Sequence, residues 1–316
     1  MVARNYLFYR ATTTLAVVFG VSVLTFALVA LTPGDPATTI LRQRLGQVPP
    51  HHVVAAFRSQ HGLDDPFVLQ YGRWLLGVIH GDLGTSYYSD RAVSSLLVGH
   101  ALPTVVLAVA AMAVALVVSI PAGVLSAVHR GEWIDFASRF GALVGVAMPN
   151  FWFGYVLIIV FSLQLGLFPV AGTGGVSYLV LPALTLGTGL TAIITRFVRT
   201  ATLEELGRPS IDMARSKGLD ERIVVYKHAL RNALVPVVTV VGLQFGYLLS
   251  GAVVVEIVFQ RPGLGTLLVD AVSARDYPVV QGVILLISVC FVVLNFLVDL
   301  TYRHLDPRIG SRSVNP

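Results

Sequence analysis

Charged residues are scarce in this chain, and their scarcity argues against an ordinary soluble fold. Asp, Glu, Lys and Arg make up 12% of its 316 residues, whereas 55% are hydrophobic and the mean hydropathy is +0.77. A soluble domain carries about 25% charged residues. The single cysteine, Cys290, has no partner for an intramolecular disulfide. The composition therefore predicts a membrane protein without covalent cross-links.

The sequence also lacks the motifs of the common catalytic sites. Neither of its two lysines, Lys217 and Lys227, stands in the Gly-Lys-Ser/Thr sequence with which a phosphate-binding loop holds ATP. Its histidines form no H-E-x-x-H pair, and no G-x-S-x-G nucleophile turn occurs. His51 and His52 are adjacent, so their side chains diverge on a helix and make a poor metal site. We expect no enzyme, and no metal or cofactor held by this chain.

Apolar residues are gathered into six stretches, each long enough to cross a bilayer. A transmembrane helix needs about 20 mostly apolar residues, because each residue rises only about 1.5 Å. The first stretch is longer than a signal-peptide core and precedes no A-x-A cleavage site, so we expect it to remain as a span. The sequence predicts an all-α polytopic membrane protein with six transmembrane helices. The stretches are residues 11–31, 102–125, 140–163, 178–197, 233–255 and 278–300.

Basic residues are distributed unequally between the two sides of the membrane. Most of the 22 Lys and Arg residues precede span one, lie between spans two and three, surround the loop after span four, or follow span six. Cytoplasmic loops are enriched in Lys and Arg. Both termini are therefore expected in the cytoplasm. This distribution accounts for the basic composition without a nucleic-acid partner.

The segment from residue 33 to residue 99 lies outside the cell in this topology and has no apolar run long enough to span. Its aromatic residues indicate that it is folded: Phe57, Phe67, Tyr71 and Trp74. Long loops in compact proteins are usually functional or disordered. Two interpretations stay open. The segment is either a docking surface or lid for an external partner, or a solvated cap with no specific role.

A short isolated helix is predicted in the cytoplasmic loop at about residues 199–232. Ser210 is placed to N-cap a helix over residues 211–217, and Gly218 stands where a left-handed C-cap favours glycine. Asp220 is placed to cap a second helix that runs to Leu230 and leads into span five.

Such a helix of two turns is unstable in water by itself. It must be laid on the membrane or held by a protein. A membrane-resting helix shows a wide apolar face, whereas Ile211, Met213 and Ala214 give only a narrow one. The sequence therefore favours a protein partner for this helix.

The loop sequence resembles the coupling loop of ATP-binding-cassette (ABC) importer permeases, and more narrowly the dipeptide/oligopeptide (Dpp/Opp) branch. The resemblance rests on A-R-S-K-G-L at residues 214–219 and H-A-L-R-N-A-L-V-P at 228–236. It departs from the branch at S-I-D-M (210–213), where an aromatic residue and an arginine are usual. Further blocks follow in order along the chain: T-P-G-D-P-A (32–37), G-D-L-G-T-S (81–86), I-P-A-G (120–123), L-F-P-V (167–170), V-E-I-V-F (255–259), P-G-L-G (262–265), R-D-Y-P-V-V-Q-G (275–282) and L-D-P-R-I (305–309).

This resemblance implies a type I ABC-importer permease in a bacterial inner membrane. It divides the chain into an N-terminal span and extracytoplasmic segment (1–94), a transmembrane domain (95–303) and a cytoplasmic tail (304–316). It implies a second, homologous but different permease, two ATPase subunits that bind ATP and Mg, and an external substrate-binding protein that delivers a peptide. Related permeases carry nickel chelates or glutathione. The residues assigned to ATPase coupling are Asp212, Met213, Ala214, Arg215, Ser216, Lys217, Gly218 and Leu219.

Polar residues within the spans are candidates for the pathway. A charge at the bilayer centre costs about 2.5–3.5 kcal/mol on insertion scales, so such groups face a cavity or a partner. Asn150 and Gln244 either line the pathway or hydrogen-bond between helices. Glu256 either faces the outer mouth, where it meets a peptide's amino terminus, or reaches the membrane interface. Asp299 is expected to pair with Arg303. The lack of midplane carboxylates disfavours the alternative of an ion-coupled secondary transporter.

Overall fold

The computed structural model describes the backbone of residues 2–305 and the side chains of residues 12–29, 31–248 and 251–297. Within this part of the chain the structure is helical, with one isolated β-bridge between Thr85 and Ala92. The helices form two compact units. Of the described residues, those up to 103 and from 262 to 292 form the first, and those from 104 to 261 and from 293 onwards form the second.

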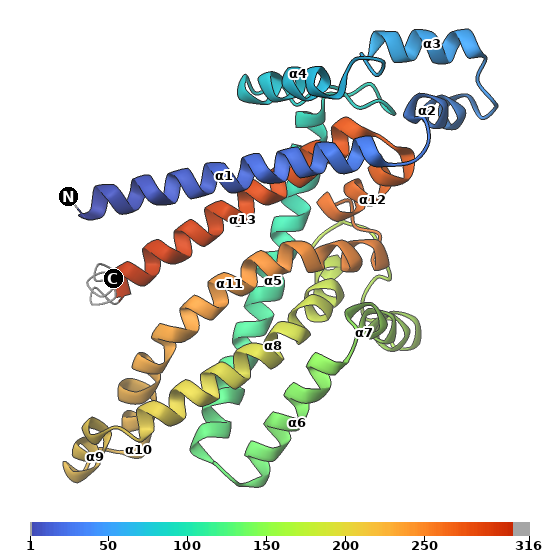
Figure 1. Cartoon of the computed structure of the whole chain (residues 1–316). Helices are drawn as coiled ribbons and strands as arrows, with labels where there is room; N and C mark the ends of the chain where they lie inside the picture. The colour runs from blue at the N-terminus through green and yellow to red at the C-terminus, as the bar shows by residue number, and fades with distance from the viewer. Residues whose placement is uncertain (1, 306–316) are drawn as a thin grey trace. The chain divides into compact units, whose positions relative to one another are not determined.

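The first unit contains the N-terminal helix and four short helices, together with the start of α5 and most of α13. Figure 1 labels them along the chain. Their bounds are α1 (Val2–Leu31), α2 (Pro36–Leu45), α3 (His51–Gln60), α4 (Phe67–Ile79), α5 (Val93–Val128), α12 (Leu264–Ala274) and α13 (Tyr277–Leu305). Val93 and Leu97 at the start of α5 pack with the buried side chains of Leu264 and Val283 in this unit.

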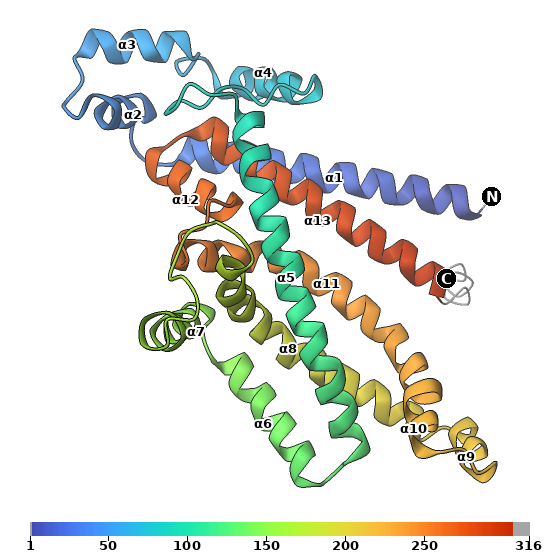
Figure 2. The same cartoon turned by 180° about the vertical axis from the view of Figure 1, so that it is seen from behind.

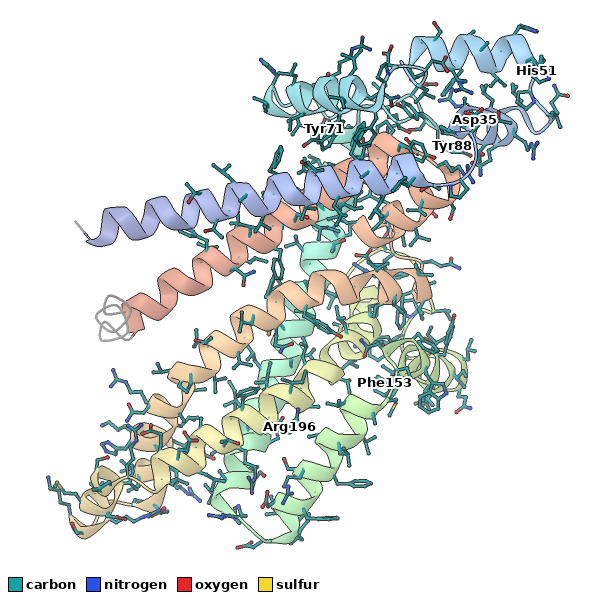
Figure 3. All side chains as sticks on the ribbon, viewed as in Figure 1. Asp35, His51, Tyr71, Tyr88, Phe153 and Arg196 are labelled. Carbon is teal, nitrogen blue, oxygen red and sulfur yellow. The ribbon has the colours of Figure 1, made fainter. Side chains whose placement is uncertain are left out.

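The segment between α1 and α5 is folded, as its aromatic residues predict. Phe57 closes a small core with Ile40 of α2. Phe26 of α1 lies 5.2 Å from Phe67 and 5.3 Å from Tyr71, measured between ring centroids. The Tyr71 and Ser22 hydroxyls are 2.9 Å apart, and Figure 3 labels Tyr71 where α4 meets α1. These contacts attach α4 to the first span.

The second unit is built around α8 (Ser177–Leu206). This helix packs against α6 (Trp133–Ala147), α7 (Asn150–Leu157) and α11 (Leu230–Val258). Both views show α8 between α6 and α11 (Figures 1 and 2). Small residues bring the backbones together, since a Cβ at Gly187 would lie 2.8 Å from the Ala111 carbonyl oxygen of α5. The remaining elements are η1 (Ile158–Gln164), α9 (Pro209–Ser216), α10 (Glu221–Ile223) and η2 (Val224–Ala229).

Five of the helical segments that the structure describes are long and apolar enough to cross a membrane. They are Thr12–Val29, Val93–Val128, Ser177–Leu206, Glu221–Leu248 and Tyr277–Leu297. They agree in position with the first, second, fourth, fifth and sixth predicted stretches.

The third predicted span, residues 140–163, is not one straight helix. It is the pair α6 and α7–η1, bent by 104°. Met148 is extended (φ −86°, ψ 123°), because the ring of Pro149 disfavours the helical conformation in the residue before it. Pro149 also lacks the N–H that would continue the hydrogen bonding of α6.

Candidate functional site

The short helix predicted in the loop between spans four and five is present as α9. It spans Pro209–Ser216 and so begins two residues earlier than the expected start at residue 211. Arg208 is the N-cap, with no side-chain capping bond, and Pro209 occupies the first helical position. The prediction that Ser210 caps the helix is therefore wrong. Proline suits the first helical position because its fixed φ matches the helix and because an N–H there would have no partner within the helix.

The turn after α9 has the geometry that its residues predict. Gly218 has φ +76°, in the left-handed region that glycine adopts without a steric penalty. Asp220 accepts a hydrogen bond from the backbone N–H of Arg222 at 2.8 Å. The helix that follows does not stop at Leu230. It passes through the π-helical turn η2 into α11, so the loop leads directly into a span.

The inner face of α9 is fixed within this chain. Ile211 and Ala214 are 3% and 9% exposed and pack with Val224 and Ala229, and Leu206 lies against the same cluster. This packing stabilises a helix that would not form alone. It also covers most of Ala214, one of the residues assigned to ATPase coupling.

The outer face of α9 is open. Met213 is 60% exposed, so the described part of the chain leaves most of this large apolar side chain uncovered. Arg215 donates to Glu221 at 2.6 Å, and this pair fixes the turn at Gly218 from outside. Every other residue of the predicted coupling set is exposed: Asp212, Met213, Arg215, Ser216, Lys217, Gly218 and Leu219.

A partly buried ion pair connects α8, which leads into α9, to the first turn of α6. Arg199 Nε and Nη2 donate to Asp135 Oδ1 and Oδ2 at 2.7 and 2.8 Å. The Ser126 hydroxyl and the Gly131 N–H also donate to this carboxylate, at 2.6 and 3.1 Å. Sequence analysis missed this network. The available signal was a lone acid in the first turn of a helix, on the side of the membrane where basic residues gather.

Two of the three pathway candidates line one pocket of about 350 Å³. Asn150 enters it from the first residue of α7, directly after the bend, and Gln244 enters it from α11. Gly189 of α8 completes this wall, because a Cβ there would lie 3.6 Å from Asn150 Oδ1. Both polar side chains are half-buried. The pocket is a neutral polar recess within mostly apolar walls.

The third candidate, Glu256, lies elsewhere. It is 1% exposed and its carboxylate accepts a hydrogen bond from the Thr104 hydroxyl at 2.6 Å. Within this chain Glu256 is therefore covered, and its role as a pathway residue stays a prediction. The sequence around Glu256 is aliphatic and does not reveal that its carboxylate contacts the hydroxyl of Thr104, 152 residues earlier in the chain. The predicted pair of Asp299 and Arg303 lies outside the described side chains.

Two family models cover nearly the whole chain. Residues 119–311 match "Binding-protein-dependent transport system inner membrane component", and residues 3–108 match its N-terminal counterpart. The chain is 42% identical to the glutathione transport system permease protein GsiC of Escherichia coli O6:H1 over 96% of this chain and 98% of that protein. It is 41% identical, with the same coverage, to the proteins of that name from E. coli K12 and Salmonella paratyphi A.

Solved structures of transporters share the fold. A structure of the MetNI methionine ABC transporter in inward-facing conformations matches with a TM-score of 0.55 and 21% identity, over 67% of this chain and 97% of that chain. A crystal structure of an amino acid ABC transporter with histidines matches with a TM-score of 0.53 and 14% identity, over 67% and 94%. The chain therefore belongs to the family of binding-protein-dependent transport system inner membrane components, as the membrane-embedded permease subunit of a Dpp/Opp-type ABC importer, in which separate subunits hydrolyse ATP.

Proposed function

We propose that this permease carries small peptides of the size of glutathione into a bacterial cell, with both of its termini in the cytoplasm. The relatives that match it over nearly their whole length are named for glutathione transport. The pocket at Asn150 and Gln244 supports this substrate class, because neutral amides both donate and accept hydrogen bonds and so match peptide groups without selecting a charge.

The working complex contains this chain, a different homologous permease, two ATPase subunits and an external substrate-binding protein. ATP and Mg bind to the ATPase subunits. This composition follows the family, whose description names the binding protein. In this arrangement the second permease encloses the pathway together with the pocket at Asn150.

The coupling step runs through α9, and the exposed side chain of Met213 is the observation that carries this proposal. The inner face of α9 packs on η2 through Ile211 and Ala214, so a movement of α9 is passed to η2 and then to α11. The Arg199 pair connects α8 to the turn that begins α6. An ATPase that moves α9 therefore tilts α8 and α11, which also carry Gly189 and Gln244.

The experiment is ATP-dependent uptake by the full complex in proteoliposomes, with the binding protein outside and labelled glutathione or a dipeptide as substrate. We expect uptake that requires ATP in the lumen and stops when the catalytic glutamate of the ATPase is replaced. Uptake of a nickel chelate in place of peptides would assign the related branch, and uptake without ATP would contradict the mechanism.

A further inference from the structure

A second pocket, of about 710 Å³, lies between α6 and α8 at the end of the second unit that carries α9. Three arginines and Thr200 line it, and its other lining residues are apolar. Of its lining residues, only Arg199 takes part in the coupling proposed above. In the topology proposed here, this end lies at the cytoplasmic leaflet of the membrane.

The charge of this pocket is positive and is only partly compensated. Arg139 of α6 and Arg196 and Arg199 of α8 line it, and no acidic residue does. Arg199 is neutralised by Asp135. Arg139 and Arg196 are exposed and take part in none of the ion pairs found among the described side chains; Figure 3 labels Arg196 on α8. Two guanidinium groups are therefore available to an anion, and guanidinium binds phosphate oxygens with strong, paired hydrogen bonds.

The apolar wall is a strip along one face of α6. Phe136, Phe140, Leu143 and Val146 follow each other at helical spacing and are 71%, 57%, 66% and 51% exposed. The rings of Phe136 and Phe140 are stacked, with centroids 6.2 Å apart. Ten residues of helix cover about 15 Å, which is about half of a 30 Å hydrocarbon core. The strip therefore has about the length of one bilayer leaflet, and Arg139 lies between its first two residues, Phe136 and Phe140.

We propose that this pocket binds an anionic phospholipid of the cytoplasmic leaflet. Its phosphate lies between Arg139 and Arg196, and one acyl chain lies along the strip of α6. Basic pockets between transmembrane helices on the cytoplasmic side are typical binding sites for anionic head groups. A hydrophilic peptide fits this surface less well than a lipid does, because the strip offers it no hydrogen-bonding groups.

The test is lipid retention by the complete transporter complex. The complex is extracted after exchange into vesicles of phosphatidylglycerol and phosphatidylcholine mixed in equal amounts, and the lipids that remain bound are measured by mass spectrometry. We expect selective retention of phosphatidylglycerol. The double variant R139Q/R196Q is expected to retain about thirtyfold less of it, since each arginine near an anionic head group contributes on the order of 1 kcal/mol.

The matched control is R130Q/R222Q, which removes the same charge from two exposed arginines that do not line the pocket. It is expected to retain phosphatidylglycerol like the unaltered complex. Equal retention by R139Q/R196Q and the control would overturn the proposal. Displacement of the lipid by inorganic phosphate would also overturn the proposal. It would show that the phosphate alone accounts for binding and that the acyl chain on the strip of α6 contributes nothing.

A second measurement does not depend on the stability of the arginine variants. Leu143→Cys in a Cys290→Ser background places one thiol on the apolar strip. A fluorophore on it is expected to be quenched by lipids that carry a spin label on the acyl chain. Efficient cross-linking of the same thiol to the second permease would show that a protein covers the strip and would overturn the proposal. Either result leaves ATP-dependent uptake, and so the proposed function, unaffected.

Discussion

Arg199 holds the carboxylate of Asp135 with two parallel hydrogen bonds of 2.7 and 2.8 Å, across 64 residues of sequence. The Asp135 side chain is 4% exposed and that of Arg199 is 20% exposed. Bidentate arginine–carboxylate pairs are geometrically specific as well as strong. This pair therefore sets the position of α8 against the turn that begins α6, and it does so near the end of α8 that leads to α9.

Arg199→Gln is expected to destabilise the second unit. It leaves a buried carboxylate without its charged partner, a change that costs about 3–5 kcal/mol in a fully buried pair. Because Arg199 is partly reached by solvent, we expect about 1–3 kcal/mol and a thermal midpoint several degrees lower for the purified complex. The control is Asp135→Asn/Arg199→Gln, which removes both charges and should be less destabilised. An unchanged midpoint in the single variant would contradict this account.

Gly218→Pro is expected to uncouple ATP hydrolysis from transport while membrane insertion stays intact. Proline fixes φ near −65°, whereas Gly218 has φ +76°, so the turn that aims α9 must change. Uptake in proteoliposomes should fall at least tenfold, with the ATPase subunits still active. Gly207→Ala is the matched control, because Gly207 has φ −85° and a Cβ there meets only ordinary contacts at 3.7 Å. Normal peptide uptake by the proline variant would count strongly against the lever role of α9.

Met213 and Ala214 are adjacent on α9, and we expect a substitution of Met213 to weaken ATPase binding and a substitution of Ala214 to lower stability. Met213→Glu places a charge on the exposed face and should weaken ATPase association about tenfold, with little effect on thermal stability. Ala214→Leu overfills the contact with Val224 and should lower stability by about 1–3 kcal/mol. Co-purification of the ATPase and thermal unfolding measure the two effects. Loss of stability in both variants would mean that Met213 is not a contact residue.

Most of the fold could be predicted because a membrane span is a property of local composition. The apolar runs located five spans correctly, and local residue chemistry placed α9 and the left-handed Gly218. The bend at Pro149 was missed because apolar content on both sides of a proline does not reveal whether the helix kinks or breaks.

Contacts between distant residues could not be predicted from one sequence. Glu256 looks the same in sequence whether it faces an open mouth or the Thr104 hydroxyl. Asp135 and Arg199 were both visible as charges near span ends, yet nothing local indicates that they form a pair. Asn150 and Gln244 were named separately as polar residues in spans. That they share one pocket follows from the packing of α7 and α11, which sequence periodicity does not define.

Tyr87 should make the first unit sensitive to alkaline pH. Burial, and then the negative charge of Asp276, raise the pKa of Tyr87 from 10.0 to about 12. The unfolded chain therefore ionises this phenol first, and the associated stability is present below about pH 10 and lost as the pH rises towards 12. Tyr87→Phe should remove this part of the alkaline loss in a thermal unfolding series. Tyr88→Phe is the control, since Tyr88 is 50% exposed. Identical pH profiles for the two variants would contradict the prediction.

Filling the pocket at Asn150 should block transport without disturbing the fold. Gly189→Leu extends a side chain towards Asn150, because the Cβ would already lie 3.6 Å from its Oδ1. We expect peptide uptake to fall at least tenfold while the complex assembles normally. Gly141→Leu is the matched control on α6, where a Cβ meets nothing within 4 Å. Asn150→Ala, which enlarges the pocket and removes one hydrogen-bonding group, should raise KM for peptide with a smaller effect on the maximal rate, because a typical hydrogen bond contributes about 0.5–1.5 kcal/mol. If Gly189→Leu transported normally, the pocket would lie off the pathway, and Asn150 and Gln244 would be left with the hydrogen bonding between helices that the sequence also allows.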